Sequence, residues 1–205
     1  MSALELSQHP LSEDSYFSGI IDRLSLTSIR PRESHLRALA HSIISQQLSI
    51  KAADTIITRT ALVVDLSDPK AILDADSVDL RNQGISRPKL RYLRALADHH
   101  QSNPDLWKNP EHLSDDQLLS ELTSITGVGL WTAQLFLMFQ LQRPDIFPAR
   151  DLILQRAVGR WFALPNRGRA RERAAESIAQ RWAPHRSLAS RLLWKWESQS
   201  DNSEL

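Results

Sequence analysis

Apolar residues recur along most of this chain with the period of a helix rather than that of a strand. Between residues 35 and 48, for example, Leu36, Leu39, Ile43 and Ile44 fall on one face of a helix. No stretch shows a convincing strand-like alternation. The pattern therefore predicts an all-α fold of about ten helices. The expected helices are 35–48, 50–64, 69–75, 77–82, 87–100, 114–123, 129–140, 151–162, 168–182 and 186–197.

Residues that commonly begin helices support several of these boundaries. Ser49 and Ser86 each precede an expected helix, where a serine oxygen accepts one of the first N–H groups. Pro88 is tolerated because it stands in the first turn of its helix. The segment Ser114–Gln117 has the spacing of a capping box. Residues 198–205 are mostly polar, and we expect them to form a frayed tail.

The composition is that of an ordinary soluble globular protein, and it excludes several kinds of site. The chain has 205 residues, of which 41% are hydrophobic and 24% charged, and it has no cysteine. It therefore cannot form disulfides or bind zinc or an iron–sulfur cluster through thiolates. No apolar run approaches the roughly 20 residues of a membrane span, and the first residues lack the features of a signal peptide. We expect a cytoplasmic protein with no membrane partner.

The basic residues are clustered, although the net charge of the chain is only +1. Residues 81–94 include arginine and lysine but no acidic residue, and a second cluster has arginines at 167, 169, 171 and 173. Solvated helix faces would explain either cluster alone. Two such clusters in one small chain favour a polyanionic partner.

The segment 122–134, LTSITGVGLWTAQ, separates two expected helices by a pair of glycines. Gly127 can take a positive φ and end the first helix, and Gly129 lets the backbone approach a ligand closely. The N–H groups that begin the second helix then point outward. Together with the helix dipole they form a site suited to a phosphate. The alternative is a simple αα-corner in which the glycines serve only the turn.

An aspartate, Asp151, follows this hairpin after the proline-containing segment RPDIFPAR. Three further motifs accompany the hairpin and the aspartate: ISQQLS (44–49), GISRPKLRYLRALA (84–97) and WAPHRSLASRLLW (182–194). Together these motifs resemble the helix–hairpin–helix (HhH-GPD) superfamily of base-excision DNA glycosylases, and most closely its 3-methyladenine DNA glycosylase II group. The resemblance extends from about residue 35 to residue 196 and so covers most of the chain.

The resemblance implies that Asp151 is the catalytic residue. Cleavage of an N-glycosidic bond passes through a transition state with positive charge on the sugar. A nearby carboxylate would stabilise that charge and orient or deprotonate water. An aspartate before LILQRAV is also an ordinary N-cap, and the two roles are compatible because a helix N-terminus favours an ionised carboxylate. The family often has an acidic or small residue before this aspartate. This chain has Arg150 instead, which would either contact phosphate or pair with Asp151.

Residue 131 determines the expected subclass of reaction. In bifunctional relatives, a lysine at this place attacks the sugar and leads to strand cleavage, whereas this chain has Trp131. The resemblance therefore implies simple hydrolysis that leaves an abasic site. It also places Trp131 and Trp194 at the base pocket, where an aromatic face attracts a cationic alkylated purine. Packing in a core is the alternative for each tryptophan. Some relatives have a tyrosine where this chain has Leu135, so the substrate range stays open.

The resemblance also assigns the contacts that hold DNA. Leu48 would be the wedge that fills the gap left by the flipped base, with a buried core leucine as the alternative. The residues that would bind the DNA backbone are Gly127, Gly129 and Thr132. Family members often hold a monovalent cation, Na⁺ or K⁺, through main-chain carbonyls of the hairpin. The matching carbonyls here are those of Thr123, Ile125 and Val128, and no other cofactor is expected.

Two helical subdomains with an active-site cleft between them are the expected organisation. Residues 35–142 would carry the wedge and the helix–hairpin–helix motif, and 1–34 with 143–205 would carry Asp151. The expected protein is a monomeric enzyme of base excision repair, located in the cytoplasm or nucleoid, or in the nucleus in a eukaryote. It would bind double-stranded DNA and hydrolyse the N-glycosidic bond of alkylated purines of the 3-methyladenine and 7-methylguanine type.

Two other functions fit the same motifs. The first is a non-catalytic protein that binds DNA structures through the hairpin, which Arg150 and Leu135 leave open. The second is a glycosylase of the same fold that acts on oxidised or deaminated bases. Release of a base from damaged DNA separates the first alternative from an enzyme, and competition among lesions separates the second.

Overall fold

The protein is built from helices, as the sequence pattern predicts. The computed structural model describes residues 1–200, without the side chains of Ala3, Leu4 and Ser200. Within residues 1–200 there are twelve α-helices, four short 3-10 helices and no strand, so the all-α class is confirmed. No helix in this range combines the length and apolar character needed to cross a bilayer. Residues 201–205 of the expected frayed tail lie outside the described residues, and residues 198–200 continue the last helix.

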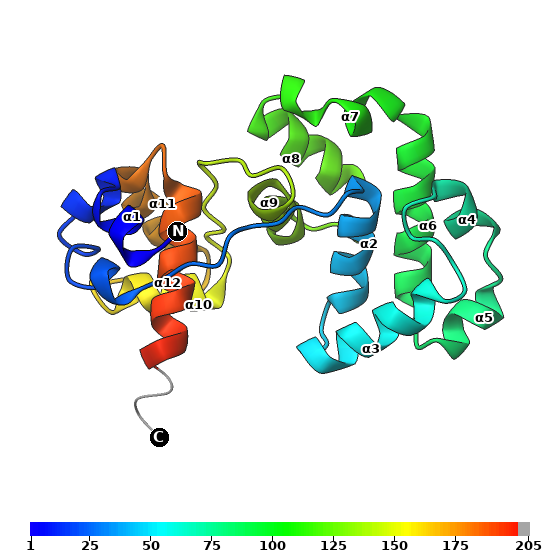
Figure 1. Cartoon of the computed structure of the whole chain (residues 1–205), viewed down its shortest axis with the longest axis horizontal. Helices are drawn as coiled ribbons and strands as arrows, with labels where there is room; N and C mark the ends of the chain where they lie inside the picture. The colour runs from blue at the N-terminus through cyan, green and yellow to red at the C-terminus, as the bar shows by residue number, and fades with distance from the viewer. Residues whose placement is uncertain (201–205) are drawn as a thin grey trace. The chain divides into compact units, whose positions relative to one another are not determined.

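Contacts along the backbone divide the chain into two units (Figure 1). The central unit is the continuous segment Pro31–Leu141, and the terminal unit combines Met1–Arg30 with Gln142–Leu205. These boundaries lie a few residues from the expected division at residues 34/35 and 142/143. Each unit contains its own buried apolar residues and is described separately below.

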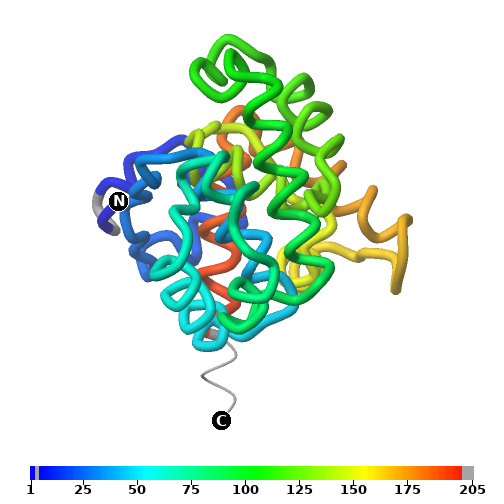
Figure 2. Tube along the Cα trace, turned by 90° about the vertical axis from the view of Figure 1, so that its right-hand side faces the viewer, coloured from blue at the N-terminus to red at the C-terminus, as the bar shows by residue number. Residues whose placement is uncertain are grey.

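The central unit is organised around its longest helix, α6 (Arg87–Ser102), which packs against α2 (His35–Ser45) and α4 (Pro69–Asp74) (Figures 1 and 2). Leucines of α6 line up on one face and are buried, as its helical period requires. The other elements of the unit are α3 (Ile50–Ala61), α5 (Ser77–Asn82), α7 (Pro104–Lys108), η3 (Pro110–His112), α8 (Asp115–Ser124) and α9 (Leu130–Phe139).

Helix ends in the central unit follow local hydrogen bonding. Ser49, Ser86 and Ser114 cap α3, α6 and α8 through their hydroxyl oxygens, and Ser114 forms the complete capping box with Gln117. Helix α3 ends at Ala61 rather than at residue 64 as expected. The N–H groups of Val63 and Val64 both turn back to the carbonyl of Thr60 there.

The terminal unit joins both ends of the chain in one core. The buried N-terminal residues Phe17 and Ile21 belong to the same apolar cluster as Leu154 and Trp182, and the rings of Phe17 and Trp182 meet edge to face at 5.4 Å between centroids. The elements of this unit are α1 (Ala3–Ser7), η1 (Pro10–Glu13), η2 (Ile21–Arg23), α10 (Leu152–Gly159), α11 (Gly168–Ala179), η4 (Gln180–Trp182) and α12 (Arg186–Ser200).

Candidate functional site

Helices α8 and α9 are joined by residues 125–129, called the hairpin below, as the glycine pattern predicts. Ile125 and Val128 are buried and anchor the hairpin in the central unit. The N–H of Val128 donates to the carbonyl of Ile125 at 2.9 Å, which closes a tight turn. Helix α9 begins directly after Gly129, a residue without a side chain to cover the N-terminal N–H groups.

The two glycines of the hairpin serve different purposes. Gly127 has φ +94°, and a Cβ added there would stand 2.2 Å from Cγ of Tyr92. Only glycine fits that position, because both its backbone conformation and its contact with Tyr92 exclude a side chain. Gly129 has φ −85°, and no described atom beyond the residue itself and its two chain neighbours lies within 4 Å of the place a Cβ would take. Gly129 therefore leaves the approach to the start of α9 open.

A cavity of about 720 Å³ lies against the hairpin. The residues that line it are Gln46, Gln47, Tyr92, 123–129, Trp131 and Thr132. The positive end of the α9 dipole faces this region, which favours an anion such as phosphate. The three residues expected to bind a monovalent cation, Thr123, Ile125 and Val128, are among the lining residues. The Ile125 carbonyl accepts the hydrogen bond of the Val128 N–H, and a cation on the three carbonyls stays a prediction.

Trp131 and Thr132 stand in the first turn of α9. The Trp131 side chain is 42% exposed, so it is available to a ligand as well as to its neighbours. Thr132 is buried, and it forms part of the cavity wall rather than an exposed contact. Leu135, one turn after Trp131, is half-buried.

The turn between α2 and α3 consists of residues 46–48, called the wedge turn below. Leu48 is 37% exposed, so it is not one of the buried leucines of the core. Gln47 has φ +59°, a conformation that costs a non-glycine residue about 1–3 kcal/mol. Gln46 donates from Nε2 to the carbonyl of Gly127 at 2.9 Å and so connects the wedge turn to the hairpin. The sequence gives no sign of this contact beyond the position of Gln46 in the motif QQLS.

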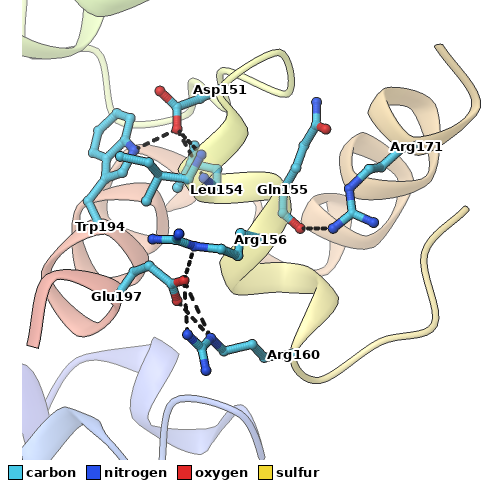
Figure 3. Close-up of polar contacts among 9 residues, drawn as sticks. Asp151, Leu154, Gln155, Arg156, Arg160, Arg171, Trp194 and Glu197 are labelled. Atoms are coloured by element: carbon cyan, nitrogen blue, oxygen red, sulfur yellow. Dashed lines mark hydrogen bonds and ion pairs between the residues drawn. The ribbon is translucent and has the colours of Figure 1, made fainter. Parts of the chain in front are cut away.

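Asp151 is the N-cap of α10, in the terminal unit (Figure 3). Its Oδ1 accepts hydrogen bonds from the backbone N–H groups of Ile153 and Leu154, both at 3.0 Å. The indole N–H of Trp194 donates to the same oxygen at 3.0 Å. The other carboxylate oxygen points away from these donors in Figure 3. The three donors fix the orientation of the carboxylate, so capping and a catalytic role are compatible in this geometry.

Trp194 is part-buried and packs against the core of the terminal unit while it holds Asp151. The structure therefore brings together two residues that the sequence analysis assigned to different roles. Trp131, Leu48 and the hairpin belong to the central unit, whereas Asp151 and Trp194 belong to the terminal unit.

The partner of Arg150 in this structure is Glu172, and the contact of Arg150 with a DNA phosphate stays a prediction. Its Nε donates to Oε1 of Glu172 on α11 at 2.9 Å, and its side chain is about half exposed. This ion pair lies near the surface, so it contributes little to stability. The sequence could not show it, because Glu172 lies on another helix.

A buried carboxylate, Glu197, stands one turn after Trp194 on α12. It forms ion pairs with Arg156 of α10 and, one turn further along, with Arg160, the C-cap of that helix (Figure 3). Nε of Arg160 is 3.1 Å from Oε2 of Glu197. Helices α10 and α12 are therefore joined at two levels, by the Asp151–Trp194 hydrogen bond and by the Glu197 ion pairs. The sequence analysis missed this cluster, since a glutamate among tryptophan and serine residues gives no sign of burial.

The four arginines of the second basic cluster differ in their surroundings: three are exposed, and one is bonded to backbone carbonyls. Arg167, Arg169 and Arg173 are exposed. Arg171 instead donates from Nη2 to the carbonyl of Gln155 at 2.9 Å and from Nη1 to the carbonyl of Pro165 at 3.1 Å. Its guanidinium therefore holds the segment between α10 and α11.

Comparisons with known proteins agree with this arrangement of motifs. Residues 40–184 match the family described as HhH-GPD superfamily base excision DNA repair protein. The chain is 32% identical to DNA-3-methyladenine glycosylase 1 of Schizosaccharomyces pombe, over 86% of this chain and 77% of that protein.

Solved structures give the same result. A DNA-3-methyladenine glycosidase from Bacillus halodurans matches with a TM-score of 0.82 and 28% identity, over 96% of this chain and 93% of that one. A 3-methyladenine DNA glycosylase from Schizosaccharomyces pombe in complex with abasic DNA matches with a TM-score of 0.74 and 27% identity, over 94% of both chains. The family match spans the wedge turn, the hairpin and Asp151 alike, and this chain belongs to the HhH-GPD superfamily of base excision DNA repair proteins.

Proposed function

We propose that this protein is a monofunctional DNA glycosylase that removes alkylated purines of the 3-methyladenine and 7-methylguanine type from duplex DNA. The proposal rests above all on Asp151, a carboxylate fixed by three N–H donors at the start of α10 in a member of this superfamily. The relatives named above, which are 3-methyladenine glycosylases, supply the substrate class.

In the proposed reaction, the bond between C1′ of the sugar and the purine nitrogen breaks, and the oxygen of a water molecule bonds to C1′. The Asp151 carboxylate stabilises the positive charge on the sugar and takes up the proton that the water releases. An alkylated purine carries a positive charge before cleavage and leaves with the bonding electron pair as a neutral base. A strong general acid is therefore unnecessary.

Trp131 supports hydrolysis without strand cleavage. A lyase needs an amine to form a Schiff base with the sugar, and an indole cannot do so. In our proposal, the exposed face of Trp131 instead contacts the cationic base. The hairpin binds a DNA phosphate at the N-terminus of α9, and a monovalent cation on the carbonyls of Thr123, Ile125 and Val128 would add positive charge there.

The test of Asp151 is base release from DNA treated with a methylating agent, with Asp151→Asn compared with the wild type. The asparagine has nearly the same shape but no charge, so we expect base release to slow by about 10²–10⁴-fold. Glu176→Gln is the matched control, because it removes an exposed carboxylate of α11 in the same unit. Full activity of Asp151→Asn would refute the role of Asp151.

The same assay defines the class of enzyme. A panel of oligonucleotides with methylated, oxidised and deaminated bases should show release of the methylated purines in preference to the others. Product strands should remain intact until alkali is added, and borohydride should trap no covalent complex. Salt-sensitive DNA binding without release of any base would instead indicate a non-catalytic DNA-binding protein.

A further inference from the structure

The wedge turn is held by backbone hydrogen bonds to the end of α2 and by a side-chain hydrogen bond to the hairpin. The N–H of Gln46 donates to the carbonyl of Ile43 at 3.3 Å, and the N–H of Leu48 donates to the carbonyl of Ser45 at 3.2 Å. The Gln46 side chain reaches the hairpin at the Gly127 carbonyl. The turn thus holds Gln47 in the left-handed region and leaves the Leu48 side chain exposed.

Lys89 fixes the same turn from a third element. It stands in the first turn of α6, and its Nζ donates to the carbonyl of Ile44 at 2.6 Å and to the carbonyl of Gln46 at 2.8 Å. Ile44 is in the last turn of α2 and Gln46 is the C-cap of that helix, where a cation also complements the helix dipole. Burial of the ammonium group lowers the pKa of Lys89 from its ordinary value, as expected for a group withdrawn from solvent.

Helix α6 contacts the hairpin as well as the wedge turn. Tyr92 stands one turn after Lys89 on α6, and its ring lies directly against Gly127. Three contacts therefore close a triangle: Lys89 to the wedge turn, Tyr92 to the hairpin, and Gln46 between the wedge turn and the hairpin. All three elements belong to the central unit.

We propose that Lys89 is the positioning residue of the wedge, which holds the turn 46–48 in one conformation relative to the hairpin before DNA is bound. An apolar wedge can replace a flipped base only if it does not give way when it meets the base stack. A turn that is already ordered loses little conformational freedom on binding, so more of its contact energy remains to separate the stacked bases. This inference rests on the proposed function for its role in base flipping, but the ordering of the turn can be tested without activity.

The first test is amide hydrogen exchange of the free protein, followed by NMR. Lys89→Met removes the three donors and keeps most of the aliphatic stem. We expect exchange of the Gln46 and Leu48 amides to rise by at least about 10-fold in this variant, while amides in the middle of α6 stay unchanged. Lys89→Arg, which can still donate to both carbonyls, should restore most of the protection. Lys108→Met is the matched control, since Lys108 is an exposed lysine of α7 in the same unit.

The second test separates base flipping from chemistry. Base release is measured from a methylated oligonucleotide as a single strand and in a duplex. Lys89→Met should slow release from the duplex by on the order of 10-fold, because a wedge that is out of place opens the stack less often. Release from the single strand should change by less than about 2-fold, since no stacked partner has to be displaced.

Other outcomes overturn the inference. Unchanged exchange at Gln46 and Leu48 would show that Lys89 does not order the turn, and an equal loss on both substrates would show that it does not act through the wedge. Exchange that rises throughout the central unit would show that Lys89 stabilises the whole unit rather than the wedge turn.

If Lys89→Met does not fold, Lys89→Gln, which keeps a donor, is measured in the same way. If the wild type releases no base, the proposed function fails, while the exchange experiment still decides the ordering of the turn.

Discussion

Gly127 and Gly129 stand two residues apart in one hairpin, and the structure assigns each a separate task. Gly127 turns the chain with a positive φ and makes room for the ring of Tyr92. Gly129 has an ordinary extended conformation with open space before it. The spacing predicts a positive φ and a close backbone approach, and it also leaves open a simple turn. The positive φ of Gly127 is confirmed, and the approach of a ligand at Gly129 stays a prediction. The partner of Gly127, Tyr92, lies on another helix and could not be predicted.

Substitution of each glycine by alanine should affect a different property, stability at Gly127 and DNA binding at Gly129. Gly127→Ala should destabilise the protein by roughly 2–4 kcal/mol, because a Cβ there meets the Tyr92 ring in a strained backbone conformation. Gly129→Ala should change the free energy of unfolding by less than about 0.5 kcal/mol. It should nevertheless weaken DNA binding, since its methyl group stands where a phosphate would approach α9.

Urea unfolding measures the stabilities, and fluorescence anisotropy with a labelled duplex measures binding. The opposite pattern, a stable Gly127→Ala or a Gly129→Ala that binds DNA as the wild type does, would contradict this assignment of the two glycines.

At the scale of helices, α10 and α12 form the frame that carries the candidate carboxylate. Asp151 is the N-cap of α10, and α10 is held to α12 by two sets of contacts. The Trp194 indole of α12 bonds to Asp151 at the start of α10, and Glu197 of α12 pairs with Arg156 and Arg160 near the end of α10. Because Arg156 and Arg160 are one turn apart, both guanidinium groups reach one carboxylate. A shift of α10 would move Asp151 with it. The ion pairs of Glu197 therefore hold the Asp151 carboxylate in position as well as stabilising the terminal unit.

Glu197→Gln should therefore destabilise the terminal unit. It leaves two arginines opposite a neutral amide in a buried place, and loss of one partner from a buried ion pair is costly. We expect a loss of roughly 2–4 kcal/mol, below the usual upper range because both arginine side chains are partly exposed to solvent. Chemical unfolding, with Glu176→Gln as the exposed control, provides the measurement. If Glu197→Gln changes the free energy of unfolding as little as the control does, the ion pairs of Glu197 do not stabilise the protein.

The sequence predicts helices well where an apolar face repeats, and less well where contacts with distant segments stabilise the helix. The expected helices from residue 35 onward are present, because buried leucines such as Leu36 and Leu39 recur at helical spacing. Helices α1 and α7 were not predicted. Each has only five residues, too few for a periodic pattern, and α7 has a single buried side chain, Trp107. Their stability comes mainly from packing, which a local pattern does not contain.

The same distinction holds for the site. Asp151 was predictable because an N-cap and a family motif coincide at one residue. The partners that hold the site, Trp194, Glu197 and Lys89, depend on contacts between helices that are far apart in sequence. The motifs therefore predict which residues contact DNA, and the fold shows which contacts hold those residues in position.

The whole molecule divides its candidate tasks between its two units. The wedge turn, the hairpin and Trp131 belong to the continuous segment Pro31–Leu141, and Asp151 with its supports belongs to the terminal unit. The central unit has buried residues from most of its helices, including α2, α6, α8 and α9. A continuous segment with its own core can fold by itself, whereas the terminal unit needs both ends of the chain.

Residues 31–141 expressed alone should therefore form a helical, cooperatively unfolding protein that still binds DNA. Binding should weaken as salt is raised, because in our proposal the hairpin binds the phosphate backbone and reads no base sequence. No base should be released from methylated DNA, since Asp151 is outside this segment. Circular dichroism and anisotropy provide the measurements, and Gly129→Ala within the same segment tests whether binding goes through the hairpin. A segment that folds but shows no DNA affinity would mean that the terminal unit contributes most of the binding, and that the hairpin and wedge turn act only after it has bound DNA.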